Sequence, residues 1–178
     1  PSPPGDLVLS VSRHEFPKRT ELFAAAALAS GRPAVAVGSG GRLPWIRHLA
    51  GRWAIDGVPD ELEASATWAT EVAPEFQVPP KPGPESTVRF AGHVDDAELD
   101  ELYRRARCVV APAYREDYGL TAIEGMARGR PVIVCRDGGG LTEMITNDVS
   151  GLIVEPTGRA IAQAIDRLAA DPELAARL

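Results

Sequence analysis

Two acidic residues, Glu116 and Glu124, flank a turn in the middle of the chain that has the features of a phosphate-binding site. Glu116 precedes a predicted helix, and Glu124 lies about five residues inside it. The backbone N–H groups of Gly119, Leu120 and Thr121 open this helix, and they attract phosphate because they lack intrahelical acceptors. A nucleoside diphosphate sugar has hydroxyl groups at both ends and a pyrophosphate between them, so this layout suits it. The helix dipole offers another explanation, because it favours acidic side chains near a helix start.

The segments around these residues form a predicted strand, helix and strand unit. Residues 108–111 and 132–135 are short apolar runs, which are typical of buried parallel strands, and residues 119–128 form the helix between them. In open parallel sheets, ligands bind outside the carboxyl ends of the strands. The loop of residues 112–118 is therefore predicted to line a site.

A second pair of candidate residues, Arg13 and Lys18, follows the first predicted strand. Pro17 closes their loop, and an alanine-rich helix is expected over about residues 18–29. Two cations between a strand end and a helix start can offset the charge of a pyrophosphate, and arginine offers a bidentate fork. The alternative is that both are solvated loop charges. The neighbouring His14 is interpreted as an ordinary loop histidine, either hydrogen-bonded or exposed.

Three further turns follow predicted strands, and glycine in such turns lets the backbone approach a ligand closely. In chain order they contain Gly38, then His93 and Val94, then Gly139. A glycine cluster after a strand is a weak signal when it stands alone.

The succession of strands and helices predicts an α/β fold: a Rossmann-like parallel sheet of about six strands, with helices on both faces and the strand ends facing one cleft. Residues 43–49 have apolar side chains at helical spacing. Residues 50–86 are predicted to be a surface insertion whose tryptophans pack on the domain, with a sugar-stacking platform or a partner contact as the alternatives.

Composition narrows the class of protein further. A length of 178 residues, 44% hydrophobic and 25% charged, indicates one globular domain, residues 1–178. A net charge of -6 argues against nucleic acid as a partner. Cys108 and Cys135 fall in predicted strands and are interpreted as buried thiols in a reducing compartment. With no secretory signal at the start, we expect a cytoplasmic protein.

Four motifs in succession carry a family resemblance: Val88-Arg-Phe-Ala-Gly-His-Val94, Glu116-x7-Glu124, Gly138-Gly-Gly140 and Ser150-Gly-Leu-Ile-Val154. Together they closely resemble the carboxyl-terminal domain of GT-B fold retaining glycosyltransferases of the glycogen synthase and sucrose synthase-like family, GT4. The resemblance covers nearly all of the chain except about residues 42–86. It implies a glycosyltransferase of the hexosyltransferase type, EC 2.4, whose donor is a UDP, GDP or ADP sugar. It implies no metal ion and no other cofactor.

The resemblance also implies roles for individual residues. Arg13 and Lys18 would grip the diphosphate and stabilise it as it leaves, while Glu116 would approach the donor sugar. Glu124 would accept hydrogen bonds from the ribose hydroxyls. The remaining binding positions would be the backbone of Gly119, Leu120 and Thr121 at sugar and phosphate, Gly38 near the nucleotide, His93 and Val94 beside the base, and Gly139 beside the sugar and phosphates.

In this family the acceptor site belongs to an amino-terminal domain, which is absent from this sequence. The chain is therefore expected to be a piece of a larger protein that binds donor weakly and transfers nothing by itself. Its expected partners are the nucleotide-sugar donor and the amino-terminal domain of the same protein. The acceptor is unknown, and peripheral membrane contact through the missing domain stays open.

Two other functions are compatible with the sequence. A sugar-nucleotide 2-epimerase shares the GT-B layout, although the order of motifs and the Gly138-Gly-Gly140 turn fit GT4 better. The second alternative is a module that binds a nucleotide and catalyses no reaction. It stays compatible with the sequence because a fold does not prove a function. The joint presence of Arg13, Lys18, Glu116 and Glu124 argues against it.

Overall fold

The computed structural model describes residues 5–59 and 86–178, and its core is one parallel sheet of six strands. The strands lie in the order β3-β2-β1-β4-β5-β6. Their bounds are β1 Leu7–Val11, β2 Ala34–Val37, β3 Val88–Gly92, β4 Ala106–Ala111, β5 Val132–Cys135 and β6 Leu152–Val154. The predicted Rossmann-like α/β architecture is confirmed.

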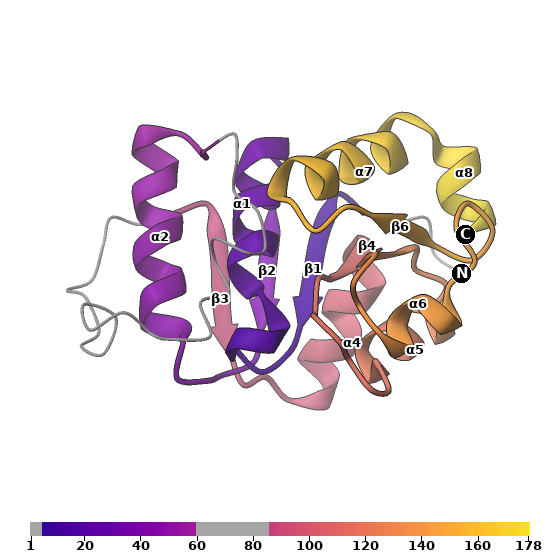
Figure 1. The fold of residues 1–178 in the computed structure, drawn as a ribbon, viewed down its shortest axis with the longest axis horizontal. Helices are drawn as coiled ribbons and strands as arrows, with labels where there is room; N and C mark the ends of the chain where they lie inside the picture. The colour runs from indigo at the N-terminus through magenta and orange to yellow at the C-terminus, as the bar shows by residue number, and fades with distance from the viewer. Residues whose placement is uncertain (1–4, 60–85) are drawn as a thin grey trace.

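Helices cover both faces of this sheet (Figure 1). One face packs against α1, α7 and α8, and the opposite face packs against α4, α5 and α6. The bounds are α1 Thr20–Ser30, α2 Leu43–Asp56, α4 Asp96–Arg105, α5 Leu120–Ala127, α6 Gly140–Met144, α7 Gly158–Ala170 and α8 Pro172–Arg177, with a 3-10 turn, η1, at Phe16–Lys18. Because both faces are covered, successive residues of a strand are buried on opposite sides, as Val8 and Leu9 are in β1.

The chain changes direction across the sheet at β1. This strand pairs with β2 on one side and β4 on the other, so the loops that leave β1 and β4 run to opposite faces. A crevice at such a reversal is the usual ligand site of an open parallel sheet. The topology therefore predicts a ligand site at the carboxyl ends of β1 and β4.

Helix α2 corrects the predicted boundary of the surface insertion. The helix expected over residues 43–49 continues to Asp56, and its Ala50 and Trp53 are buried against α1 together with Ile46. Residues 50–56 thus belong to the packed domain, so the start of the insertion at residue 50 was placed too early. Trp53 does pack on the domain as predicted, whereas Trp68 belongs to residues 60–85 of the predicted insertion, which lie outside the described residues.

None of the helices in residues 5–59 and 86–178 combines the length and the apolar character that crossing a membrane requires.

Candidate functional site

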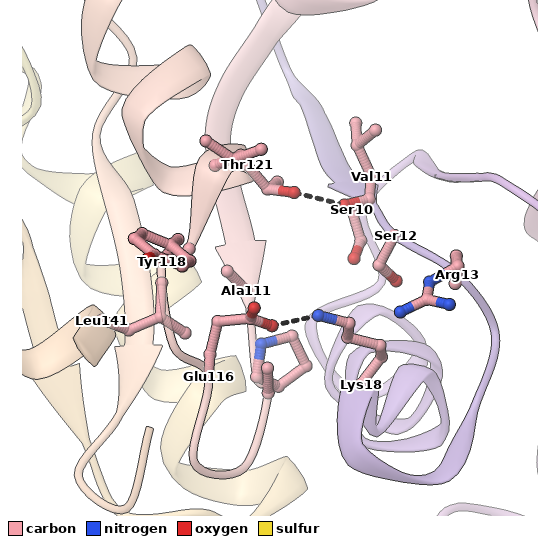
Figure 2. A pocket seen from close by; sticks show the side chains of 14 residues that line it. Ser10, Val11, Ser12, Arg13, Lys18, Ala111, Glu116, Tyr118, Thr121 and Leu141 are labelled. Carbon is pink, nitrogen blue, oxygen red and sulfur yellow. Dashed lines mark hydrogen bonds and ion pairs between the residues drawn. The ribbon is translucent and has the colours of Figure 1, made fainter. Parts of the chain in front are cut away.

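A cavity of about 270 Å³ opens where β1 and β4 end (Figure 2). Residues 10–13 form the wall on the β1 side, and residues 111–113 form the floor at the end of β4. The start of α5, residues 118–121, closes the other side together with Leu141. The cavity thus lies at the crevice that the strand order selects.

Six of the residues predicted from the sequence meet around this cavity: Arg13, Lys18, Glu116, Gly119, Leu120 and Thr121. They come from three separate segments, the loop after β1, the loop after β4 and the first turn of α5. The Arg13 and Lys18 side chains approach from the β1 side, with Glu116 opposite them (Figure 2).

Lys18 and Glu116 form an ion pair across the cavity, Nζ to Oε2. Their side chains are 22% and 21% exposed, so solvent screens the pair only partly. The positive charge of Lys18 and the negative charge of Glu116 offset each other here. Arg13 stays exposed to solvent, with its guanidinium on the cavity side (Figure 2).

The first turn of α5 presents unpaired backbone donors to the same space. Its first internal hydrogen bond runs from the Ala122 N–H to the Gly119 carbonyl at 2.9 Å, so the N–H groups of Gly119, Leu120 and Thr121 precede it. Gly119 adopts a left-handed conformation, φ 59°, and a Cβ atom there would lie 2.3 Å from Leu141 Cδ2. A glycine is therefore needed at this position to let the helix start so close to α6.

Two serines belong to the site and were missed in the sequence, Ser10 within β1 and Ser12 directly after it. Ser10 and Ser12 line the cavity, and Ser12 Oγ is buried without a hydrogen-bond partner among the described residues. The Thr121 hydroxyl is occupied, because it donates to the Val11 carbonyl at 2.7 Å and ties α5 to β1. The alternation of strand residues could have identified the serines, since Ser10 and Ser12 share a face at the carboxyl end of the strand.

Glu124 lies outside the lining of this cavity. It follows Leu120 by four residues and Thr121 by three, so it shares their face of α5 about one turn farther on. Its Oε2 accepts a hydrogen bond from the Tyr103 hydroxyl at 2.9 Å. Glu116 thus lies at the cavity, in the loop before α5, whereas Glu124 lies within the helix and outside the cavity lining.

The turn containing Gly139 supports Glu116 from behind. The Glu116 N–H donates to the Gly138 carbonyl at 2.9 Å, and the Gly140 N–H donates to the Glu116 carbonyl at 2.7 Å. A Cβ atom on Gly139 would lie 2.9 Å from Arg115 Cα, so the close approach that requires this glycine is to the chain itself. Gly139 also lines a shallow polar hollow with Glu143, next to the cavity.

The other predicted positions lie away from the cavity wall. Gly38 donates to the Gly92 carbonyl at 2.7 Å, and a Cβ atom there would overlap the Ser12 carbonyl oxygen. The close approach that requires a glycine here is to the backbone directly after β1. His93 is exposed in the loop after β3, while Val94 packs against the core on the α4 face.

A buried arginine, Arg19, joins the loops around the site and was not predicted. It is 1% exposed and has a left-handed backbone, φ 49°. Its guanidinium binds both carboxylate oxygens of Asp137 at 2.7 and 2.9 Å and donates to the carbonyls of Pro112 at 2.6 Å and Ala113 at 3.1 Å. Arg19 therefore fixes the loop that carries Lys18 to the strand ends of β4 and β5.

His14 and the two cysteines are buried groups near this framework. His14 is 1% exposed, its Nδ1 lies 3.1 Å from Thr20 Oγ1, and burial lowers its pKa. Of the two alternatives expected for His14, hydrogen-bonded or exposed, the structure shows the hydrogen-bonded one. Cys108 and Cys135 are buried as predicted, and desolvation raises the pKa of each thiol to about 12.

Comparison with known proteins agrees with this architecture. The chain is 41% identical over 85 residues to an uncharacterized glycosyltransferase of Methanocaldococcus jannaschii, matching 47% of this chain and 22% of that protein. It is 39% identical over 97 residues to a D-inositol 3-phosphate glycosyltransferase of Streptomyces bingchenggensis, matching 54% of this chain and 21% of that protein. The matched stretches thus cover about half of this chain and about a fifth of the length of these relatives.

Solved structures share the fold. The C-terminal domain of a glycosyl transferase group 1 family protein (LpcC) from Francisella tularensis superposes with a TM-score of 0.70 at 24% identity, covering 98% of this chain and 80% of that one. Anabaena Alr3699/HepE in complex with UDP-glucose superposes with a TM-score of 0.70 at 19% identity, covering 97% of this chain and 41% of that one. At these identities the likeness establishes the fold alone.

The family model for glycosyl transferases group 1 matches residues 81–178, more than half of the chain. The chain belongs to the group 1 family of glycosyl transferases.

Proposed function

We propose that this chain is the nucleotide-sugar donor-binding domain of a retaining glycosyltransferase of the GT4 type. The observation that carries the proposal is the convergence of Arg13, Lys18 and the open start of α5 on one cavity at the strand reversal. Two cations and a set of unpaired N–H groups suit a diphosphate. The UDP-glucose complex of Alr3699/HepE, which has the same fold, is consistent with such a ligand.

In this proposal the pyrophosphate lies against the first turn of α5, with Lys18 and Arg13 opposite. A phosphate oxygen would replace Glu116 as the partner of Lys18, which leaves the Glu116 carboxylate to accept a hydrogen bond from a sugar hydroxyl. Glu124, one turn along the helix, would receive the ribose hydroxyls. The nucleotide would then lie along one face of α5, with its two ends at the two acids.

The catalytic contribution of these residues is electrostatic. As the glycosidic bond to the pyrophosphate breaks, negative charge grows on the leaving phosphate oxygen. The ammonium of Lys18, the guanidinium of Arg13 and the N–H groups at the α5 start line the same cavity, and in this proposal they stabilise that charge. The acceptor and the domain that binds it are part of this proposal, because the stretches that match this chain cover only about a fifth of the length of the relatives.

Thermal unfolding with UDP, GDP and ADP tests the binding step. A ligand at about 100 times its Kd stabilises the folded state by about 2.7 kcal/mol, which raises the Tm of a domain of this size by roughly 5–11 °C. We expect at least one of the three nucleotides to do this, with Lys18→Gln weakening its Kd by roughly tenfold to a hundredfold, because a hydrogen bond to a charged group is lost.

A matched control is Arg52→Gln, which removes an exposed cation of α2 that pairs with Asp56 far from the cavity. It should leave the Kd unchanged. The proposal fails if none of the three nucleotides raises the Tm, and the site assignment fails if Lys18→Gln and Arg52→Gln bind equally well.

A further inference from the structure

Glu124 has one buried partner to which the proposed function gives no role, the hydroxyl of Tyr103. This hydroxyl donates to Glu124 Oε2 at 2.9 Å, and the Tyr103 side chain is fully buried at 0% exposure. The two residues come from neighbouring helices on the same face of the sheet, α4 and α5. Among the described residues, Tyr103 is the hydrogen-bond donor to the Glu124 carboxylate.

The Tyr103 ring is held in place from two sides. Its inner side packs in the core formed by α4, α5 and the sheet. The Arg128 guanidinium lies over the ring, 4.5 Å from its centroid, and is itself held by Asp100 through bonds of 3.1 and 2.6 Å. The phenol therefore presents its hydroxyl in one fixed direction, toward Glu124.

The direction of the hydrogen bond follows from the charges. Burial raises the pKa of Tyr103 above its ordinary value, and the hydrogen bond to Glu124 and that residue's negative charge raise it further. Tyr103 thus keeps its proton and acts as the donor. One oxygen of the Glu124 carboxylate is occupied by this bond, and the second is left to accept from a ligand.

The position of Glu124 along α5 sets which part of a ligand it reaches. Leu120 and Thr121 line the cavity and share the helix face of Glu124. A ligand whose phosphates lie at the helix start would place its next group near Glu124, about one turn or 5.4 Å farther along. In a nucleoside diphosphate that group is the ribose, with its 2′ and 3′ hydroxyls.

We propose that Tyr103 is a positioning residue that orients the Glu124 carboxylate toward the ribose hydroxyls, so that this pair selects ribonucleotides over 2′-deoxyribonucleotides. The inference rests on the proposed function and adds to it the group that sets sugar discrimination. It predicts that the Tyr103 hydroxyl affects recognition of one hydroxyl on the ligand, and does not affect the phosphates.

Tyr103→Phe tests this directly, because it keeps the buried ring and removes the hydroxyl. Calorimetry gives the Kd of the nucleoside diphosphate that binds, for example UDP, and of its 2′-deoxy counterpart, for the wild-type chain, Tyr103→Phe and Glu124→Ala. We expect the wild type to prefer the ribonucleotide by roughly tenfold or more, as for a hydrogen bond to a charged group. Tyr103→Phe should reduce that ratio by roughly three- to tenfold while the Kd of the deoxynucleotide stays the same, and Glu124→Ala should abolish it.

Ser30→Ala is the control, because it also deletes a single hydrogen-bonding hydroxyl, which donates to the Ala27 carbonyl at the end of α1. It should leave the ratio unchanged. An unchanged ratio in Tyr103→Phe, with the ratio lost in Glu124→Ala, overturns the role of Tyr103 and leaves the proposed function intact. Absence of binding by any nucleoside diphosphate to the wild type overturns both.

Discussion

Removing the carboxylate of Asp137 tests how the loops around the site are held together. In the structure this carboxylate binds the Arg19 guanidinium through two bonds, of 2.7 and 2.9 Å. Arg19 is 1% exposed, so its charge has little access to water once Asp137 is shortened to alanine. The carbonyls of Pro112 and Ala113 would remain as its partners.

The size of the effect follows from burial. Removal of one member of a fully buried ion pair destabilises a protein by about 3–5 kcal/mol. The Asp137 side chain is 33% exposed, so water can replace part of its contact with Arg19. We therefore expect Asp137→Ala to lower the free energy of unfolding by about 2–3 kcal/mol, which corresponds to a Tm lower by roughly 4–12 °C.

Urea denaturation followed by circular dichroism measures this change, and the adjacent ion pair provides a matched control. Glu155 pairs with Arg136 at 2.6 Å, but the two side chains are 60% and 67% exposed. Glu155→Ala should therefore lower the free energy of unfolding by less than about 1 kcal/mol. Equal losses in Asp137→Ala and Glu155→Ala would refute the claim that burial makes the Arg19 pair important.

Two further predictions concern a glycine and a histidine of the site framework. Gly119→Ala should lower the free energy of unfolding by about 2–4 kcal/mol, because a strained left-handed backbone is combined with a clash at Leu141. Gly31→Ala has the same backbone strain and nothing within 4 Å, so it should lower the free energy of unfolding by only about 1–2 kcal/mol. Equal losses in urea titrations would contradict this. Burial lowers the pKa of His14 below 6.5, so the unfolded chain takes up its proton first as the pH falls. Stability should therefore decrease as the pH drops through about 6.5 toward the lowered pKa, and His14→Gln should weaken this dependence; an unaltered pH dependence in His14→Gln would disprove it.

The sheet and most helices could be predicted because their signals are local. Apolar runs rich in β-branched residues mark strands that are buried on both faces, and every predicted strand lies within two residues of an observed one. The end of α2 could also have been read correctly. Ile46, Ala50 and Trp53 follow the spacing of one helix face and are all buried, so the helical pattern continues past residue 49.

The cavity itself was predictable because parallel strands bring their carboxyl ends to one edge of the sheet. This rule alone places the loop with Lys18 near the loop with Glu116, although 98 residues separate them. It does not tell which side chains will meet within that edge. The sequence therefore indicated the cations, the acid and the helix start, but it did not indicate that Lys18 and Glu116 pair with each other.

Arg19 shows why the rest could not be read from the sequence. A left-handed backbone is uncommon for a residue with a side chain, so nothing local predicts φ 49° at an arginine. Its partner Asp137 is 118 residues away, and the two meet only because β1, β4 and β5 are adjacent in the sheet. An arginine next to a lysine in a loop suggests a second solvated charge, whereas the three-dimensional context buries the Arg19 side chain almost completely.

Arg19 holds together the two loops that carry Lys18 and Glu116. Arg19 directly follows Lys18 in the chain. Its guanidinium donates to the carbonyls of Pro112 and Ala113, at the start of the loop that leads to Glu116. The same loop is held from the other side, where the Tyr114 N–H donates to the Pro17 carbonyl at 2.7 Å. Because both loops are fixed to each other through backbone groups, breaking the ion pair requires only that two side chains rotate. In the proposed function, a diphosphate would therefore replace Glu116 as the partner of Lys18 while the walls of the cavity keep their positions, which is the preorganisation that stabilising a leaving group requires.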